Sequence, residues 1–462
     1  MSHVRITIGA IPDVALLQVF DAFLNEAERT EEWHTLVHVC QRWRYVVFTS
    51  PRRLNLRLLC IARRPVRQML GIWPTLPIVI SDLADATSLE EGADNISAAL
   101  KHHDRVSRIS LWSVPNFLFG RFAAAMLQPF PELTSLALRS SDESAFVLPN
   151  SFLGGSAPRL RSIYLNNIAF PALRRLLVSL VNLVHLHVWD NPPSSYISPE
   201  AMVPCLVAMT RLESLHLGFR SPRSPSGGSG RRPPPTRTIL PALSHFEFHG
   251  GCEYLEDIVA RINAPLVRIV RLKLFNQIIF NISQLPQFID HADRFNALNH
   301  ANIVMSRHSV EVKLLSQPGT VDRTILVMGV SCGVSDWQLS SLAQVCGSCS
   351  SYLSTVEHLD IREDQYSRPH WQDDIESAQW IELLRPFAAV KNLFFSEELA
   401  LRVTPPLVEL TEERVTEVLP ALRDLFVEGL QPMGHIQEAL GKFTTSRQIS
   451  GFPVAVHHWG KG

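Results

Sequence analysis

The sequence predicts an α/β protein with a short α-helical module at its N-terminus and an irregular array of strand-and-return repeats behind it. Residues 11–51 place large apolar side chains at helical spacing. From residue 106 a second apolar pattern recurs at intervals of 23 to 31 residues. The chain has 462 residues and is 46% hydrophobic, which is sufficient for a large core.

The helical module begins at Ile11-Pro12-Asp13, because proline and aspartate favour the first turn of a helix. One helix face then carries Leu16, Leu17, Phe20, Phe23 and Leu24. A second apolar run contains Trp33, Leu36, Val37, Cys40, Trp43 and Val47, and it stops before Pro51. A module of about 40 residues cannot bury all of these side chains by itself. We therefore expect another protein or the next domain to cover part of this surface.

Two segments of this module, Ile11-Pro12-Asp13-Val14-Ala15-Leu16-Leu17-Gln18-Val19-Phe20 and Val39-Cys40-Gln41-Arg42-Trp43-Arg44, carry a resemblance to a known family. Together they resemble an F-box, a helical module that docks onto the Skp-type adaptor of a cullin–RING ubiquitin ligase. The segment between Phe20 and Cys40 is longer than in the common F-box by more than a helical turn. Further segments, up to residues 451–456, resemble F-box-like proteins of mushroom-forming (basidiomycete) fungi, so the likeness covers almost the whole chain. The resemblance implies adaptor binding through Ile11, Pro12, Leu16, Leu17, Phe20, Val39, Cys40 and Trp43.

The repeat pattern consists of an apolar residue, two variable positions, an apolar residue, one variable position and a third apolar residue. It occurs from Val106, Leu133, Leu160, Leu183, Leu212 and Leu243, and again from Val356, Val390 and Leu422. Such a period is typical of leucine-rich repeats, in which each strand and its return segment bury their apolar sides only against neighbouring repeats. Most return segments have helical character: residues 119–127, 172–180, 199–209, 254–262, 374–384 and 412–419. We expect strands on the concave face of a solenoid and helices on its convex face.

The repeat pattern becomes less regular after residue 266. Residues 310–315 and 324–330 flank Gln317-Pro318-Gly319 and predict a β-hairpin within the array. We expect a helical module at 8–60, a connecting and capping segment at 61–105, the repeat array at 106–435 and a C-terminal cap at 436–462. Residues 221–237 lack apolar side chains and predict a disordered loop, with Ser221 and Ser224 as candidate phosphorylation sites.

The variable strand positions point away from the leucine core and are therefore candidates for binding a protein target. They include Tyr164, His187, Trp189, His216, His249, Asp360 and Arg362. Aromatic side chains suit protein recognition, because they combine a large contact area with a polar tip.

Composition argues against several other classes of function. A formal net charge of −1 and an isoelectric point near 7.0 disfavour nucleic acid as the main partner. No apolar stretch reaches the length of a membrane span, and the N-terminus does not resemble a secretory signal. Seven scattered cysteines indicate reduced thiols and a cytoplasmic or nuclear protein.

No catalytic constellation, metal site or cofactor motif emerges from the sequence. Cys346-Gly347-Ser348-Cys349 supplies two thiols, which with Cys332 nearby do not make four zinc ligands. Our leading hypothesis is a non-catalytic substrate-recognition subunit that binds a Skp-type adaptor, and through it a cullin, with its helical module and a protein target with its repeats. The alternatives are a repeat scaffold whose helical module only caps the array, and an enzyme that uses Cys332, Cys346 and Cys349.

Overall fold

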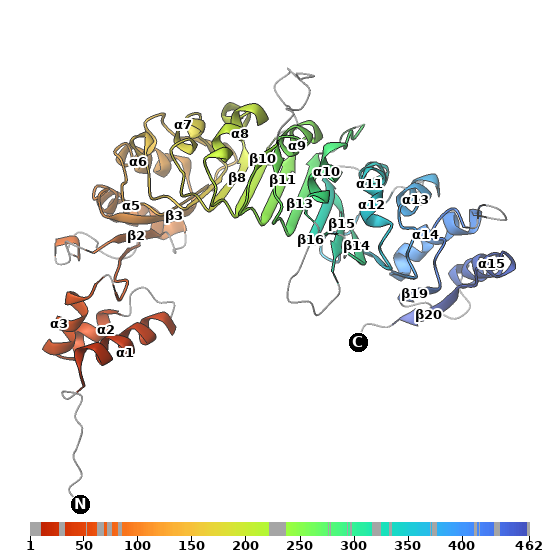
Figure 1. The fold of residues 1–462 in the computed structure, drawn as a ribbon, viewed down its shortest axis with the longest axis horizontal. Helices are drawn as coiled ribbons and strands as arrows, with labels where there is room; N and C mark the ends of the chain where they lie inside the picture. Colours follow the sequence, from red (N-terminus) through yellow and green to blue (C-terminus); the bar gives the residue numbers. More distant parts are fainter. Residues whose placement is uncertain are drawn as a thin grey trace, which may run out of the picture. The chain divides into compact units, whose positions relative to one another are not determined.

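The structure is a computed structural model that divides into two compact units, residues 1–196 and 197–462, which we describe separately. It describes residues 11–26, 33–51, 53–61, 69–71, 76–81, 86–220, 237–275, 277, 279–292, 294–295, 298–316, 325–331, 335–369, 371, 377–410, 414, 416–428 and 435–459. The α/β class predicted from the sequence is confirmed in both units. Helices and strands alternate along the chain, as Figure 1 shows.

The N-terminal module contains three helices: α1 (Asp13–Glu26), α2 (Trp33–Val39) and α3 (Gln41–Thr49). The carbonyl oxygen of Pro12 accepts hydrogen bonds from the amides of residues 15 and 16, which fixes the start of α1. The second apolar run forms two helices, because Cys40 is extended and its Sγ accepts a hydrogen bond from the amide of Trp43 as the N-cap of α3. Helical spacing alone does not reveal this break.

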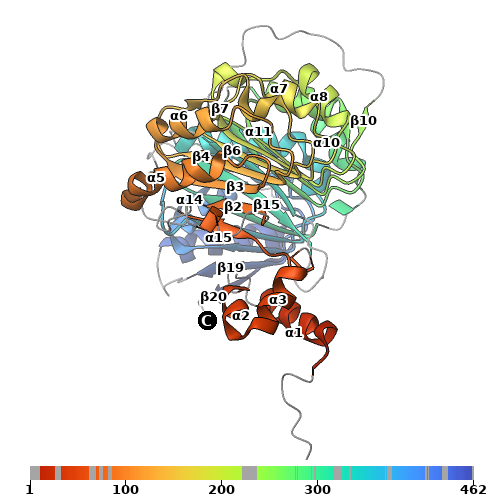
Figure 2. The same ribbon diagram turned by 90° about the vertical axis from the view of Figure 1, so that its left-hand side faces the viewer.

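The main sheet of the first unit is parallel and has the strand order β1, β2, β3, β4, β6, β8. These strands are β1 (Leu58–Cys60), β2 (Ile78–Ser81), β3 (Val106–Val114), β4 (Ser135–Ser140), β6 (Ser162–Asn166) and β8 (His185–Asn191), while β5 (Phe146–Val147) pairs with β7 (Ile168–Ala169). The return segments contain α5 (Ala86–Leu100), α6 (Asn116–Ala125), α7 (Leu173–Leu177) and the 3-10 turns η2 (Phe152–Gly155) and η3 (Pro193–Ser195). Figure 2 shows α5, α6 and α7 along one side of these strands. The sheet therefore begins at β1, ahead of the first repeat recognised in the sequence.

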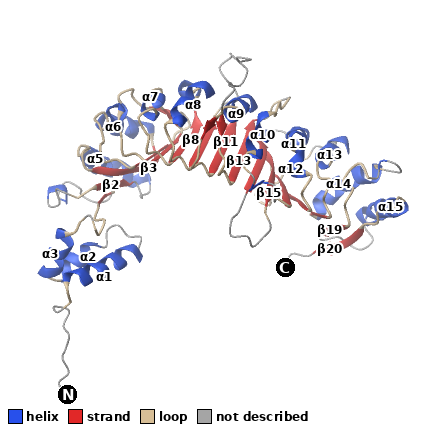
Figure 3. Ribbon diagram, viewed as in Figure 1, coloured by secondary structure: helices blue, strands red, loops and turns tan. Residues whose placement is uncertain are grey.

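The sheet of the second unit has the order β9, β11, β13, β16, β15, β14, β17, β18, β19, β20. These strands are β9 (Ser214–Phe219), β11 (His245–Gly250), β13 (Ile269–Phe275), β14 (His300–Met305), β15 (Ser309–Leu315), β16 (Ile325–Ser331), β17 (His358–Glu363), β18 (Asn392–Phe395), β19 (Asp424–Glu428) and β20 (Ala455–Trp459), while β10 (Thr238–Ile239) pairs with β12 (Ile262–Asn263). The helices are α8 (Pro199–Val207), α9 (Cys252–Val259), α10 (Gln284–Asp290), α11 (Ser335–Ser348), α12 (Ser350–Leu353), α13 (Ser377–Leu384), α14 (Glu397–Glu409) and α15 (His435–Ile449). In both units, Figure 3 shows the return helices gathered on one face of the strands.

The predicted repeat pattern coincides with the strands, and its apolar positions form the core. Every apolar position of the nine patterns is at most 4% exposed. Side chains alternate between buried and more exposed along β6, β11 and β17, as the pleat of a strand requires. Register, burial and the alternation of strand and return segment together give each unit the architecture of leucine-rich repeats.

The β-hairpin predicted around Gln317-Pro318-Gly319 is present as an antiparallel pair between β15 and β16, although residues 317–324 lie outside the described residues. The structure adds β14, which is also antiparallel to β15, so the insertion is a three-stranded meander. Because β14 and β16 are each parallel to the repeat strands beside them, the meander continues the parallel order on both sides.

The return helix predicted at residues 412–419 is wrong. Described residues 414 and 416–419 do not form an α-helix, and the helix of this repeat lies upstream as α14. The sequence interpretation missed α14 because Pro405 and Pro406 lie inside it, and proline usually breaks a helix. Buried Leu399, Val403 and Leu407, at helical spacing, hold the segment against the core.

The end of the chain contains α15 and β20, and β20 pairs in parallel with β19. Arg447 of α15 is completely buried, and its Nη2 donates to the carbonyl oxygens of Leu419, Pro420 and Leu422. Burial lowers the pKa of this guanidinium.

Among the described helices, none has the length and the apolar character needed to span a membrane.

Candidate protein-interaction surfaces

The helical module covers part of the surface that the sequence interpretation left exposed. Leu16 is 2% exposed, Leu17 8% and Phe20 0%. The ring of Phe20 lies edge-on to Trp43, with 4.7 Å between centroids. The expectation that these three side chains need a foreign surface to shelter them is therefore wrong. A periodicity argument counts apolar side chains but does not show how closely three short helices approach one another.

The other predicted adaptor-binding residues remain accessible to different degrees. Pro12, Val39 and Cys40 are exposed, whereas Ile11 and Trp43 are half-buried. Arg42 joins the two ends of the motif, because its guanidinium donates to the carbonyl oxygen of Ile11 and to the carboxylate of Asp13. The ion pair brings Pro12 and the 39–40 turn to the same corner of the module.

The sequence interpretation did not select Val14, which is 62% exposed in the first turn of α1, next to this corner. Val39 is 57% exposed. Val19 of α1 is 58% exposed as well. Three valines this open to water on so small a module are unusual, because Val is among the residues most often buried. We name Pro12, Val14, Val39 and Cys40 the module corner.

Each sheet has an open face, which we define as the strand positions that alternate with the buried apolar positions. The seven predicted target-binding residues lie at such positions and are half-buried or exposed. In the first unit Tyr164 and His187 are register partners on β6 and β8, with ring centroids 6.0 Å apart, and Trp189 pairs in register with Asn166. Their placement agrees with the prediction, and their binding role stays a prediction.

The open face of the first unit also carries residues that the sequence interpretation missed. Trp112 is 41% exposed, and its ring centroid lies 4.7 Å from that of Tyr164. Ala137 of β4 pairs in register with Ser110 on one side and with Tyr164 on the other, and Ser110 Oγ accepts a hydrogen bond from Trp112 Nε1. Two aromatic rings from β3 and β6 thus meet across the intervening strand β4. Register between repeats is the signal that would have identified Trp112.

Two arginines, Arg108 and Arg139, occupy exposed positions of the same face. The remaining outward positions of the four longest strands are Ser110, Trp112, Ser135, Ala137, Ser162, Tyr164, Asn166, His185, His187 and Trp189. None of these is a carboxylate. Asp190, the one acidic residue on these described strands, is half-buried at the end of β8, where its φ of 49° interrupts the alternation.

The open face of the second unit pairs some of its titratable side chains with one another, whereas Arg271 and Lys273 of β13 are exposed. His216 lies 3.4 Å from Glu247, its register partner on β11. The guanidinium of Arg362 donates to the carboxylate of Asp360, with 2.8 Å between Nε and Oδ1, and this pairing raises the pKa of the arginine. Two of the predicted target-binding residues of this unit, Asp360 and Arg362, therefore neutralise each other.

The second unit has a stack of rings near its C-terminal edge. Phe394, Phe426 and His457 occupy one register row on β18, β19 and β20, with successive centroids 4.4 and 4.8 Å apart. The Nε2 of His457 lies 2.7 Å from the carboxylate of Asp424. His249, another predicted target-binding residue, lies with its ring centroid 4.9 Å from that of Phe275.

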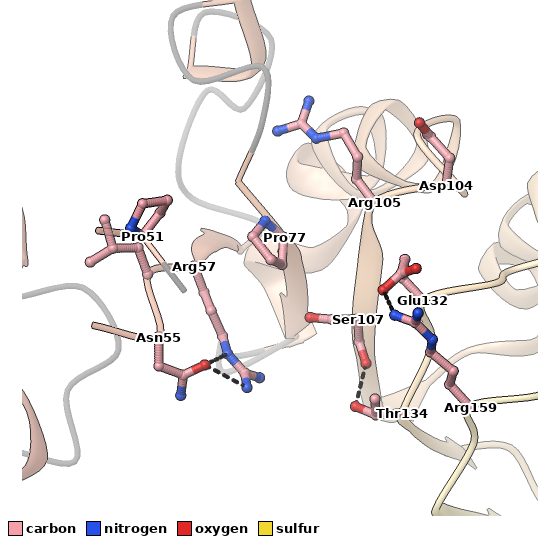
Figure 4. Close-up of a pocket in the computed structure, with 11 residues that line it drawn as sticks. Pro51, Asn55, Arg57, Pro77, Asp104, Arg105, Ser107, Glu132, Thr134 and Arg159 are labelled. Atoms are coloured by element: carbon pink, nitrogen blue, oxygen red, sulfur yellow. Dashed lines mark hydrogen bonds and ion pairs between the residues drawn. The ribbon is translucent and has the colours of Figure 1, made fainter. Parts of the chain in front are cut away.

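The first unit contains a hollow of about 660 Å³ at the amino-terminal ends of its strands, shown in Figure 4. The three arginines that line this hollow all have hydrogen-bond partners. Arg57 donates to Asn55 Oδ1, Arg105 donates to the carbonyl oxygen of Leu76, and Arg159 donates to the carboxylate of Glu132. Burial, and secondarily the charge of Arg108, lowers the pKa of Arg57. Arg57 and Arg108 thus form one electropositive edge of the open face.

The cysteine alternative finds little support in the described residues. Cys346 and Cys349 are both fully buried, at the end of α11 and the start of α12. Burial raises the pKa of both thiols, to about 12 for Cys349, which opposes the thiolate that nucleophilic or metal chemistry needs. Cys332 lies outside the described residues, and no group of three potential metal-binding side chains occurs among those described.

The fold defines a class, a repeat protein of parallel strands and return helices with the leucine-rich-repeat pattern in its core. No protein-family model matches the chain, and no curated protein sequence matches it. One solved structure similar to the chain is that of the leucine-rich repeat-containing protein LegL7 from Legionella pneumophila. It is 13% identical, with a TM-score of 0.28, over 76% of this chain and 94% of that chain. A likeness this distant carries no argument, so the class rests on the register and burial described above.

Proposed function

We propose that the chain is a non-catalytic interaction scaffold that recognises substrates for a ubiquitin ligase of the Skp–cullin–F-box type. In this proposal the helical module docks onto a Skp-type adaptor, and the open faces of a solenoid, with strands on its concave side, hold a protein target. The resemblance of residues 11–20 and 39–44 to an F-box motivates the adaptor. The chain would then contribute proximity, and partner proteins would supply the chemistry.

The single observation that carries the proposal is the helix-free open face of aromatic, histidine and charged side chains in each unit. Repeat proteins bind partners on such extended sheet surfaces. The module corner supports the docking part, because exposed Val14 and Val39 would gain by burial under a partner. Buried Leu16, Leu17 and Phe20 would support the corner from within rather than touch the adaptor.

The burial of Leu16, Leu17 and Phe20 favours a second function. A module that already covers Leu16 and Phe20 has a core of its own, and a scaffold without ubiquitin-ligase association needs nothing further. In this alternative the module is only a terminal element of the repeat array, and Val14 and Val39 are ordinary exposed residues.

Binding of a purified Skp-type adaptor to the full chain distinguishes the two functions. We expect the double variant Val14→Asp and Val39→Asp to weaken binding at least about tenfold, because two carboxylates would be buried in the contact. The matched control is Val178→Asp with Val181→Asp, since these valines are 56% and 52% exposed in the first unit outside the module. Absence of adaptor binding by the unmodified chain would leave the scaffold alternative.

A further inference from the structure

The open face of the first unit has an excess of positive charge that no ion pair among the described residues balances. Arg108 and Arg139 are exposed, and neither forms an ion pair with any residue that the structure describes. The outward positions of β3, β4, β6 and β8 supply two arginines and two histidines and no carboxylate. Arg57 adds a further positive charge beside Arg108.

The open face of the second unit shows that this fold can neutralise such charges itself. There, Glu247 lies beside His216, Asp360 beside Arg362 and Asp424 beside His457. A partner that covered Asp360 and Arg362 would find their charges already paired. A partner that covered Arg108 and Arg139 would desolvate two unpaired guanidinium groups, which is costly unless it brings carboxylates of its own.

The same face offers an apolar anchor on the strands that carry the two arginines and on the next strand, β6. The rings of Trp112 and Tyr164 meet across β4, and Trp112 is 41% exposed. Trp, Tyr and Arg are the residues that most often dominate binding energy in protein interfaces. Strands β3 to β8 span three inter-strand spacings of about 4.8 Å, so about four to five residues of an extended peptide cross the face.

We propose that the open face of the first unit binds an extended segment of a protein partner that is rich in Asp and Glu. Its carboxylates contact Arg108 and Arg139, and one apolar or aromatic side chain packs on the Trp112–Tyr164 pair. This inference rests on the proposed scaffold function and names the class of partner. Single-stranded nucleic acid also combines negative charge with stacking surfaces. Peptide is favoured, because two unpaired arginines, both confined to the neighbouring strands β3 and β4, do not make the continuous basic track that a phosphate backbone follows.

The test is fluorescence anisotropy with the full chain and a labelled peptide of about ten residues, long enough to cross the face. In this peptide Glu and Asp alternate with Gly around one Tyr. A second peptide has Gln and Asn in place of every Glu and Asp, and labelled oligo(dT) is the nucleic-acid probe. We expect the acidic peptide alone to bind, with an affinity that falls as salt rises.

Arg108→Glu and Arg139→Glu should each weaken binding of the acidic peptide about tenfold, and Trp112→Ala should weaken it to a similar extent. Lys273→Glu is the matched control, because Lys273 is an exposed outward residue of β13 in the second unit and the charge change is identical. The control variant should bind the peptide as the unmodified chain does. Equal binding of the neutral peptide, or an equal loss in Lys273→Glu, overturns the proposal.

Tighter binding of oligo(dT) through the same arginines overturns it in favour of nucleic acid. Adaptor binding by the same variants separates this inference from the proposed function. If the adaptor still binds while the acidic peptide does not, only the assignment of the partner class fails. If the unmodified chain binds the acidic peptide and no adaptor, the face is a binding site and the ubiquitin-ligase function fails.

Discussion

Two phenylalanines of α1 provide a matched test of whether the helical module has its own core. Phe20 is completely buried and its ring packs on Trp43, whereas Phe23 is 39% exposed one turn further along the helix. Phe20→Ala removes a buried aromatic side chain and leaves a cavity, which costs about 3–5 kcal/mol. Phe23→Ala removes partly exposed surface, and we expect a cost of about 1 kcal/mol or less.

Amide hydrogen exchange, measured for each peptide of the full chain, reports the local stability of the helical module. A loss of about 3 kcal/mol should speed exchange in α1, α2 and α3 by about 100-fold, since a module of this size has little stability to spare. Peptides from β3 and β4 serve as the internal reference and should not change. Unchanged protection of the module in Phe20→Ala, or a larger effect of Phe23→Ala, would refute the argument that Phe20 belongs to an internal core.

Two further predictions concern titratable groups. Burial raises the pKa of Cys346, and it raises the pKa of Cys349 to about 12. Iodoacetamide should therefore label exposed Cys40 in the native chain and reach the two buried cysteines only after unfolding, as measured by peptide mass spectrometry. Labelling of the buried pair at the rate of Cys40 would contradict this prediction. Burial, together with the stacked ring of His358 at 4.4 Å, lowers the pKa of His300 in the folded chain. The unfolded chain then binds a proton more readily, so stability rises with pH across the unfolded value near about 6.5 and is lost on acidification. His300→Asn should shrink the difference in Tm between about pH 7.5 and about pH 5.5, and an unchanged difference would contradict the assignment.

The apolar periodicity was sufficient to place the repeat strands. A residue such as Leu165 or Leu215 occupies a position that alternates with polar neighbours and returns at the repeat interval, and both are buried in the structure. The physical reason is local, because the pleat of a strand fixes which side chains share a face. Helices were predicted less well where local preference and packing disagree, as at Pro405 and Pro406 of α14.

The binding candidates depended more strongly on the tertiary structure. The sequence identified Tyr164 and His187 as outward residues, but the contact between Tyr164 and Trp112 depends on the register of β3, β4 and β6. The 3.4 Å approach of His216 to Glu247 depends likewise on which repeats lie side by side. Residues tens of positions apart become neighbours only through that register, which no single repeat encodes.

The sequence by itself determined the class of fold and the side of each strand that faces the core, because both follow from short-range periodicity. Only the tertiary structure decided which apolar side chains of the helical module are exposed. The approach of α1 to α3 buries Phe20 and leaves Val14 and Val39 in water. The burial of a side chain depends on the packing between helices, and the spacing of apolar residues within one helix does not predict that packing.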